Sequence, residues 1–335
     1  MQVRRDVRLA DLTTLAVGGP IDRLVEVSDA EELVAAVRDA DEAGRPLLVL
    51  GGGSNVVGPD EGWPGDVVAV RTCGIERVGD ALTVQAGEAW DDLVAYAVRN
   101  GLAGVEALAG IPGSTGATPV QNVGAYGQEV AQTITSVHVY DRAEKSRREL
   151  TPAECGFGYR DSRLKQEPGR LIVLDVTFEL HPGSRSRPVG YAELARTLGV
   201  EIGDTAPLAE VRDAVIALRR GKGMVLDPTD PDSRSAGSFF TNPVVPGDRA
   251  VDGCPSWPAD DGHIKLSAAW LVQHAGFGRG TRQGNVGTST RHSLALTTEP
   301  GATATELMAF AERVIEAVRD QFGVTLVPEP TAVRP

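Results

Sequence analysis

Residues 110–127 read Gly110-Ile111-Pro112-Gly113-Ser114-Thr115-Gly116-Ala117-Thr118-Pro119-Val120-Gln121-Asn122-Val123-Gly124-Ala125-Tyr126-Gly127, a stretch that we call the second glycine loop. The first glycine loop is Gly51-Gly52-Gly53-Ser54-Asn55, and it follows the apolar run 46–50, which predicts a β-strand. Successive glycines allow positive φ angles and can turn backbone N–H groups inward to form a concave anion site. A pyrophosphate fits such a site, although glycines after a strand also serve tight turns for steric reasons alone.

The common nucleotide-binding and hydrolase motifs are absent from the chain. Val56 occupies the place of the third glycine in G-x-G-x-x-G, and the loop Pro59-Asp60-Glu61-Gly62 follows where a dinucleotide-binding fold has a helix. Neither G-x-x-x-x-G-K-[ST] nor G-x-S-x-G occurs. These observations argue against a Rossmann dehydrogenase and exclude P-loop NTPases and α/β-hydrolases of the usual kind.

Composition limits the partners of this protein. The chain of 335 residues carries 33 Lys and Arg against 46 Asp and Glu, a formal charge of -13, and no basic block suited to nucleic acid. No apolar run approaches the ~20 residues that a membrane-spanning helix needs, so we expect two or three domains in a cytoplasmic monomer. Cys73, Cys155 and Cys254 are too widely spaced for a disulfide framework or a zinc site, and we interpret them as core thiols with no metal bound.

Periodicity and capping signals predict four helices. The first begins at an expected capping box, Ser28-Asp29-Ala30-Glu31, and ends near Gly44; the others cover 90–98, 208–218 and 307–318. Two further strands are predicted, one over 171–180 and a last one over 324–327. Residues 227–262 are rich in Pro, Asp, Ser and Gly, as expected of long loops around a site or between domains.

Together the two glycine loops resemble the flavin-cradling loops of the UDP-N-acetylenolpyruvoylglucosamine reductase family. Further motifs of that resemblance follow in the same order along nearly the whole chain: 12–15, 18–20, Phe157-Gly158-Tyr159-Arg160-Asp161-Ser162, 236–243 and Pro328-Glu329. The resemblance implies an α+β protein with an FAD-binding domain of the vanillyl-alcohol oxidase type at 1–222, in subdomains of about 1–70 and 71–222. The resemblance also implies a smaller α+β substrate-binding domain at 223–322. It is followed by a C-terminal strand and tail at 323–335, which are expected to return to the active site.

The resemblance implies that FAD is the cofactor and NADPH the co-substrate. We expect FAD to be bound non-covalently, because the two loops offer backbone donors and no matched nucleophile for a tether. The implied reaction reduces UDP-N-acetylglucosamine enolpyruvate to UDP-N-acetylmuramate for peptidoglycan. Hydride addition to the outer carbon of an enolpyruvyl ether leaves negative charge that delocalises into the carboxylate, so cations or donors must hold that group and an acid must protonate the inner carbon. The resemblance assigns Arg160 to the carboxylate, Glu329 to the enol intermediate and Ser238 to proton donation. The residues alone do not decide whether Glu329 is protonated.

The resemblance also implies the binding residues. Tyr191, Lys222 and Asn242 are expected to bind substrate, with Tyr191 marking the branch of the family whose tyrosine loop closes over the substrate. His292 matches a family position but stays outside the predicted catalytic set. Residues expected to bind FAD are Gly51, Gly52, Gly53, Ser54, Asn55, Pro112, Gly113, Ser114, Gly116, Ala117, Thr118, Gln121, Asn122, Gly124 and Ala125.

Two other functions are compatible with the same fold. One is a flavin oxidase, a class that often tethers its flavin covalently; none of the five histidines lies in either glycine loop, so a histidyl tether there is excluded. The other is a UDP-sugar sensor without turnover. The joint presence of Arg160, Ser238 and Glu329 argues against the sensor.

Overall fold

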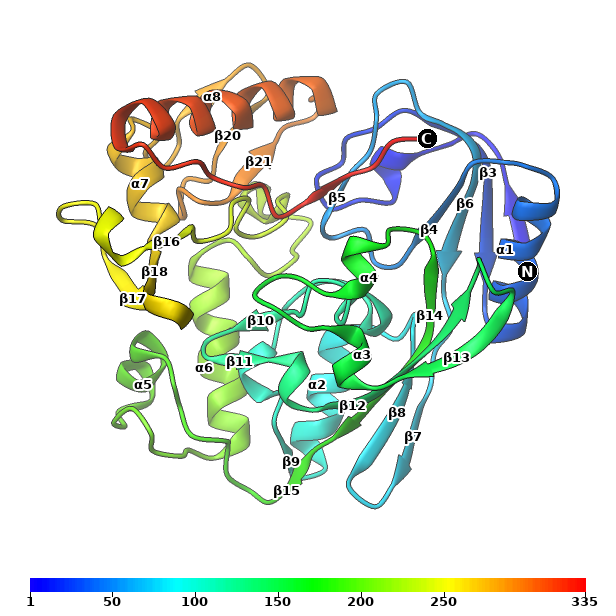
Figure 1. Cartoon of the computed structure of the whole chain (residues 1–335), viewed down its shortest axis with the longest axis horizontal. Coiled ribbons are helices and arrows are strands. Elements are labelled where there is room, and N and C mark those ends of the chain that lie inside the picture. The colour runs from blue at the N-terminus through cyan, green and yellow to red at the C-terminus, as the bar shows by residue number, and fades with distance from the viewer.

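The computed structural model describes every residue from Met1 to Pro335. Its N-terminal sheet has the order β1-β3-β6-β4, in which β3 (Pro20–Val27), β6 (Trp63–Val70) and β4 (Leu47–Leu50) are parallel. β1 (Gln2–Arg4) and β2 (Val7–Arg8) pair antiparallel with β3. Helix α1 (Ala30–Glu42) buries Leu33 and Val37 against this sheet (Figure 1). The first glycine loop therefore begins where the parallel strand β4 ends.

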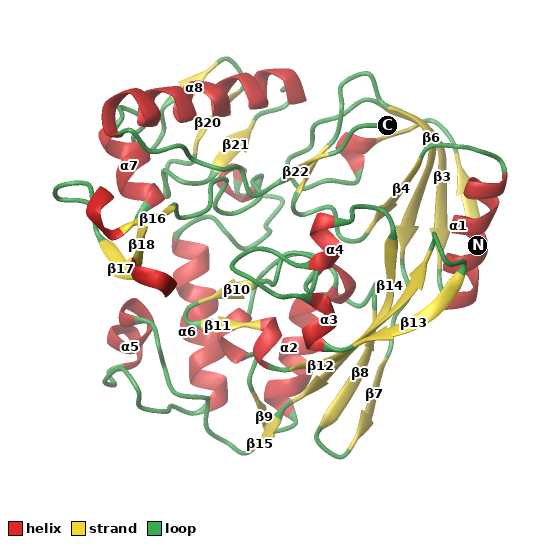
Figure 2. Ribbon diagram, in the orientation of Figure 1, coloured by secondary structure: helices red, strands yellow, loops and turns green.

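A second, antiparallel sheet lies below the N-terminal sheet, at the lower right of Figure 2. Its order is β13 (Ser146–Leu150), β12 (Ile134–Asp141), β14 (Leu171–Glu179), β8 (Ala81–Gln85) and β7 (Ile75–Val78). Helices α2 (Trp90–Arg99) and α6 (Leu208–Gly221) pack beside it, and α5 (Ala192–Leu198) packs on α6. One core of 40 buried residues joins both sheets and these helices, so residues 1–222 share most of their apolar interior.

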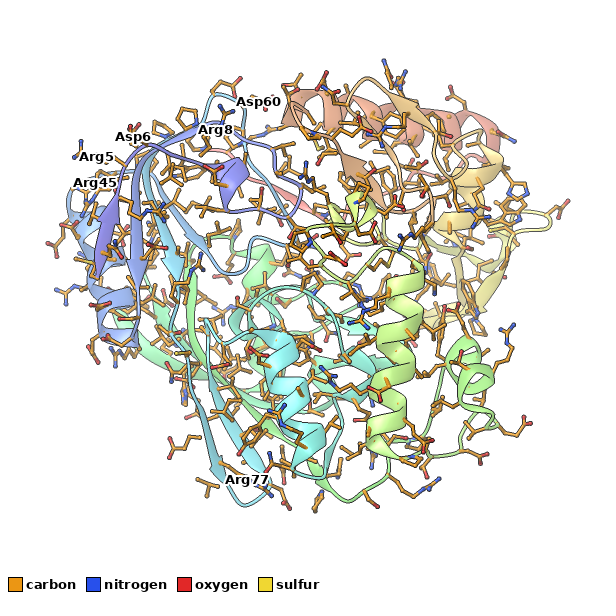
Figure 3. All side chains as sticks on the ribbon, turned by 180° about the vertical axis from the view of Figure 1, so that it is seen from behind. Arg5, Asp6, Arg8, Arg45, Asp60 and Arg77 are labelled. Atoms are coloured by element: carbon orange, nitrogen blue, oxygen red, sulfur yellow. The ribbon has the colours of Figure 1, made fainter.

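The C-terminal lobe has its own core of 21 buried residues, centred on α7 (Ala268–His274) and α8 (Ala304–Phe322). Two small sheets complete it: β16 (Val244–Pro246), β18 (His263–Leu266) and β17 (Ser256–Pro258), and β19 (Arg282–Gln283), β20 (Val286–Thr288) and β21 (Leu296–Thr298). Asp60 of the N-terminal part accepts hydrogen bonds from the amides of Ala304 and Thr305 at 2.7 and 2.8 Å (Figure 3). This cap fixes the first turn of α8 to the other lobe.

The C-terminal tail crosses between the lobes (Figure 1). Strand β22 (Thr331–Ala332) pairs in parallel with β5 (Val56–Val57), directly after the first glycine loop. Just before it, Pro328 forms an isolated bridge with Phe240, and the amide of Glu329 donates to Phe239 O at 2.8 Å. The tail is thus hydrogen-bonded to both lobes.

All four predicted helices and the strands predicted at 46–50 and 171–180 are confirmed as α1, α2, α6, α8, β4 and β14. The N-cap of α1 is Asp29, one residue later than predicted, while Ser28 bonds Glu32. The predicted strand 324–327 is wrong: the segment is extended and buries Val324 and Leu326, but the tail's only strand is β22. The predicted loop region 227–262 contains the short strands β16 and β17.

The cysteine interpretation holds only in part. Cys155 is buried and Cys254 is half-buried, but Cys73 is exposed. It lies in the turn after β6, just before Gly74, whose φ is +142°. None of the helices combines the length and apolar character needed to cross a bilayer.

Candidate active site

A cavity of about 470 Å³ lies between the two glycine loops, the end of α6, the segment 233–238 and the tail. This volume falls within the range usual for ligand sites, ~300–1,000 Å³. It brings together most of the predicted site residues: 51–55, Pro112, Gly113, Ser114, Ala117, Thr118, Gln121, Gly124, Ala125, Arg160, Tyr191, Lys222, Ser238 and Glu329. No cysteine is among the residues that line it.

The glycine loops pack so closely that side chains would not fit. A Cβ on Gly51 would lie 2.2 Å from Ser114 Oγ, and one on Gly52 would lie 2.6 Å from Gly113 Cα. Gly53 has φ +65° and would place a Cβ 2.0 Å from Leu12 O. Ser54 Oγ joins the loops by donating to Pro112 O at 2.9 Å.

Backbone donors are available in this cradle. The amides from Gly52 to Asn55 donate no hydrogen bond to another part of the chain, and neither do those of Gly113 and Ser114. Gly53 and Ser114 are buried. Since buried backbone donors are almost always paired, the N–H groups of this cradle fit an anionic ligand such as the pyrophosphate of FAD. Asn55 Oδ1 is also buried without a partner, and it can accept a hydrogen bond from a bound molecule.

Three predicted site residues do not line the cavity. Gly116 packs against the antiparallel sheet at β8 and β14, where a Cβ would lie 2.5 Å from Ala86 Cβ. Asn122, with φ +45°, donates to Glu129 Oε2 and Gly158 O, both at 2.9 Å. Asn242 Oδ1 accepts from the amide of Ala268 at 2.9 Å and so caps α7. Through these contacts Gly116, Asn122 and Asn242 support the cavity wall without lining it.

Arg160 and Glu329 face each other across the site. Arg160 Nε lies 3.4 Å from Glu329 Oε1, and the two side chains are only 18% and 16% exposed. The Arg160 Nη groups donate to the carbonyl oxygens of Asn122 and Gly124, so part of the guanidinium holds the second glycine loop. Burial raises the pKa of Glu329, against the opposing positive charges of Arg160 and Lys165. The pair combines a permanent cation with a carboxyl group that tends to keep its proton.

Ser238 follows Gly237, which has φ +72°, and precedes the fully buried Phe239 and Phe240. The amide of Phe239 donates to Leu294 O at 2.7 Å, and its carbonyl accepts from Glu329. Backbone pairing therefore holds Ser238 and Glu329 on one wall of the cavity, although they are far apart in the chain.

The predicted substrate residues Lys222 and Tyr191 both contact the Tyr126 ring. Lys222 Nζ lies 2.5 Å from Glu193 Oε2 and 5.5 Å from the centre of the Tyr126 ring. Tyr191 precedes the first residue of α5, is 42% exposed, and contacts the Tyr126 ring edge-on. Burial raises the pKa of Tyr126 to about 12, so its hydroxyl stays protonated.

Arg219 and Tyr126 are among the cavity residues that were not predicted as part of the site. Arg219 is buried and donates to Gly110 O and Met224 O at 3.2 and 2.9 Å. The sequence contained a signal for Arg219. The buried residues of α6 are Leu208, Val211, Val215 and Arg219, and a charged residue at helical spacing with apolar ones indicates a specific role for its side chain. Tyr126 lies within the second glycine loop but has no motif that assigns it a role.

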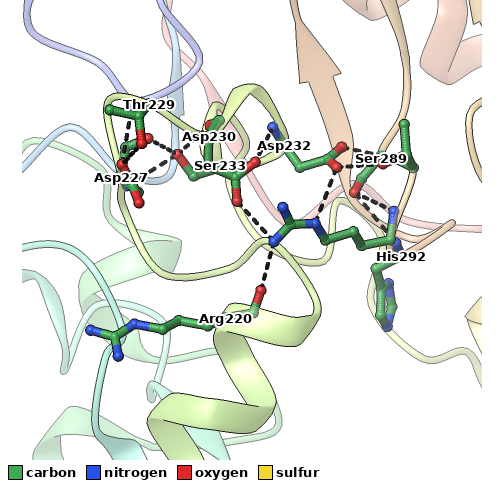
Figure 4. A network of polar contacts seen from close by, with 10 residues as sticks. Arg220, Asp227, Thr229, Asp230, Asp232, Ser233, Ser289 and His292 are labelled. Carbon is green, nitrogen blue, oxygen red and sulfur yellow. Dashed lines mark hydrogen bonds and ion pairs between the residues drawn. The ribbon is translucent and has the colours of Figure 1, made fainter.

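His292, left outside the predicted catalytic set, also lines the cavity. Its Nδ1 accepts from the amide of Leu294 at 3.2 Å, so the neutral ring carries its proton on Nε2. Burial, with the nearby charge of Lys222, lowers its pKa to about 4. Figure 4 shows the network behind it, in which Arg291 Nη1 donates to Arg220 O and pairs with Asp230, each at 2.9 Å. This network ties the end of α6 to the C-terminal lobe.

Comparisons with known proteins agree with this architecture. Residues 21–148 match the family described as "FAD binding domain", and residues 228–333 match "UDP-N-acetylenolpyruvoylglucosamine reductase, C-terminal domain". The UDP-N-acetylenolpyruvoylglucosamine reductase of Thermobifida fusca is 53% identical over 98% of this chain and 97% of its own length. That of Cutibacterium acnes is 51% identical over 98% of this chain and 89% of its own.

Among solved structures, the crystal structure of UDP-N-acetylenolpyruvylglucosamine reductase from Thermus caldophilus superposes with a TM-score of 0.70. It is 28% identical, and the match covers 100% of both chains. The predicted fold, with an FAD-binding domain of the vanillyl-alcohol oxidase type, is confirmed.

Proposed function

The chain belongs to the UDP-N-acetylenolpyruvoylglucosamine reductase family, and we propose that it reduces UDP-N-acetylglucosamine enolpyruvate to UDP-N-acetylmuramate in peptidoglycan synthesis. The reductant that we propose is NADPH, and the bound cofactor is FAD, held non-covalently by the two glycine loops. The observation that carries the proposal is the meeting of Arg160, Ser238 and Glu329 in one cavity with both loops. FAD supplies hydride transfer between NADPH and the enolpyruvyl group.

The proposed roles of the chain's own residues follow from the charges that the reaction creates. Hydride addition to the outer carbon of the enolpyruvyl group moves its π electrons toward the carboxylate, which becomes an enediolate. Arg160 stabilises this charge through N–H groups that its loop contacts leave available. Glu329 donates a hydrogen bond to the same oxygens when it is protonated, which its burial favours.

Ser238 completes the reaction by proton transfer. Its hydroxyl proton goes to the inner carbon as the enediolate collapses, and solvent returns a proton to the serine oxygen. The net change is one hydride from NADPH and one proton added across the double bond. Lys222 and Tyr191 are proposed to hold the diphosphate and the sugar, and Asn242 is proposed to assist substrate binding indirectly, since its Oδ1 is bonded to the Ala268 amide at the start of α7.

The test is a spectrum followed by an activity measurement. Purified protein should show the visible absorption of bound FAD, and NADPH oxidation should require UDP-N-acetylglucosamine enolpyruvate and yield UDP-N-acetylmuramate. A flavin oxidase would instead consume oxygen with an alcohol. A sensor would bind the UDP-sugar without oxidising NADPH, and that result would refute the proposed function.

A further inference from the structure

Three side chains on the cavity wall form a hydrogen-bonded chain that ends at Glu329. Asn55 Nδ2 donates to Glu329 O at 3.3 Å and also to Gln121 Oε1. Gln121 Nε2 in turn donates to Glu329 Oε1 at 3.4 Å. The first glycine loop, the second glycine loop and the tail each contribute one residue.

The orientation of both amides is fixed by a backbone group. A carbonyl oxygen can only accept, so Asn55 must turn its amino group toward Glu329 O. The same amino group then requires the oxygen of Gln121, and the Gln121 amino group must point at Glu329. The carbonyl itself is held in place, because Glu329 N donates to Phe239 O at 2.8 Å and Thr331 N donates to Asn55 O at 3.0 Å.

The two carboxyl oxygens of Glu329 therefore have different surroundings. Oε1 receives the Gln121 N–H and lies nearest the Arg160 guanidinium. Oε2 has no hydrogen bond within the protein and is not a buried atom, so it is accessible from the cavity. A proton on Oε1 would oppose an N–H donor and a cation, whereas a proton on Oε2 meets neither.

We propose that Gln121 is the positioning residue for Glu329: with Arg160 it binds Oε1 and thereby places the carboxyl proton on Oε2, directed at the substrate. Asn55 sets the orientation of Gln121 and is the second member of this device. The inference rests on the proposed function, because a proton on Oε2 matters only where an enolpyruvyl carboxylate is bound. It assigns to Gln121 a role beyond contact with FAD.

The test compares three variants by their dependence on pH. Gln121→Leu removes the donor to Oε1, and Gln121→Glu replaces it with a second carboxyl group of similar size. Gln166→Leu is the matched control, because Gln166 Nε2 donates to the exposed Asp161 carboxylate at 2.7 Å and lies outside the cavity. The charged and titratable groups that face Glu329 are Arg160, Lys165 and Tyr159, and all variants keep them.

Removing a donor from a carboxylate disfavours its charged form. In Gln121→Leu the alkaline limb of kcat/KM for the enolpyruvyl substrate should move up by about one pH unit, the equivalent of one charge-assisted hydrogen bond. The limb should move further in Gln121→Glu, because two carboxyl groups in contact resist ionising together. The Gln166→Leu profile should match the parent protein.

A second readout does not depend on turnover. In an infrared titration, the carbonyl band of the protonated Glu329, identified by its loss in Glu329→Gln, should persist to higher pH in both Gln121 variants. Unmoved limbs and an unmoved band in both Gln121 variants would overturn the inference. Absence of UDP-sugar-dependent turnover in the parent protein would instead overturn the proposed function.

Discussion

Substrate binding should exchange one partner of Lys222 for another. Its Nζ already lies 2.5 Å from Glu193 Oε2, and the two side chains are 25% and 36% exposed. A diphosphate that binds Lys222 must therefore compete with a carboxylate of the protein itself. Such a half-exposed ion pair contributes about 0–1 kcal/mol, whereas a charge-assisted bond to a phosphate oxygen contributes about 1.5–3 kcal/mol.

These values predict changes of KM in opposite directions for substitutions of Lys222 and Glu193. Lys222→Ala should raise KM for the UDP-sugar by roughly 2–150-fold, which corresponds to the difference of about 0.5–3 kcal/mol between the bond gained and the pair lost. Glu193→Gln should lower KM by up to about 5-fold, because the competing carboxylate charge is gone. With Glu193 replaced, Lys222→Ala should cost more than it does in the parent protein, which a double-mutant cycle would measure.

The assay is steady-state NADPH oxidation at saturating NADPH, supported by titration of UDP-N-acetylmuramate binding. Lys145→Gln is the control, since it removes the same charge from an exposed position outside the cavity. It should leave KM unchanged if local contacts, not the net charge of -13, govern binding. An unchanged KM in Lys222→Ala would exclude Lys222 from the site. A raised KM in Glu193→Gln would show that the ion pair builds the site and does not compete with the substrate.

Three further predictions concern Ser238, the attachment of FAD and His138. In Ser238→Ala, NADPH should still bleach the flavin band, while reoxidation by the enolpyruvyl substrate should slow by about 10²–10⁴-fold in stopped-flow absorbance, the usual contribution of a positioned acid; equal slowing of both halves would indicate general damage. Acid precipitation should leave a colourless pellet and a yellow supernatant, since the two glycine loops offer backbone donors and no nucleophile matched to a tether, and no cysteine lines the cavity; a yellow pellet would show covalent FAD. Burial lowers the pKa of His138, but the carboxylates of Asp175, 2.5 Å away, and Glu149, 3.5 Å away, outweigh it and raise the pKa above its ordinary value. The stabilising contribution of His138 should therefore be complete below about pH 6.5 and be lost as pH rises through the higher folded pKa. Thermal unfolding of His138→Gln should lack that component, and an identical pH dependence in both proteins would contradict it.

Local sequence signals predicted much of the fold because they act over short distances. Helical periodicity and the glycine at the end of α8, with φ +67°, are properties of a few neighbouring residues. The segment 324–327 shows where such signals stop. Val324 and Leu326 are buried while Thr325 and Val327 are exposed, as in a strand, but the ladder partner that would make it one is absent. Pairing depends on the rest of the fold, which a single segment cannot encode.

In the candidate site, too, some residues could be predicted from local sequence and others could not. The glycine loops and the Arg160, Ser238 and Glu329 motifs are contiguous and could be recognised by resemblance. Glu193 could not, because its relation to Lys222 arises from the packing of α5 on α6. The chain from Asn55 through Gln121 to Glu329 joins residues separated by up to 274 positions, and no local pattern marks it.

Glu329 lies six residues from the end of the chain. Residues so close to a terminus are poorly ordered unless other parts of the protein hold them. Here the tail is held from both sides. Phe239 O binds the Glu329 amide from the C-terminal lobe, while Asn55 O and Val57 O accept from Thr331 and Val333 at 3.0 Å each from the FAD-binding side. Because these bonds flank Glu329 and the first lies next to Ser238, any movement of one lobe relative to the other must displace the two groups together or break a backbone bond. The distance between the proposed acid and the proposed enol-stabilising group is therefore set by the backbone hydrogen bond from Glu329 N to Phe239 O, and not by the rotamers of the two side chains alone.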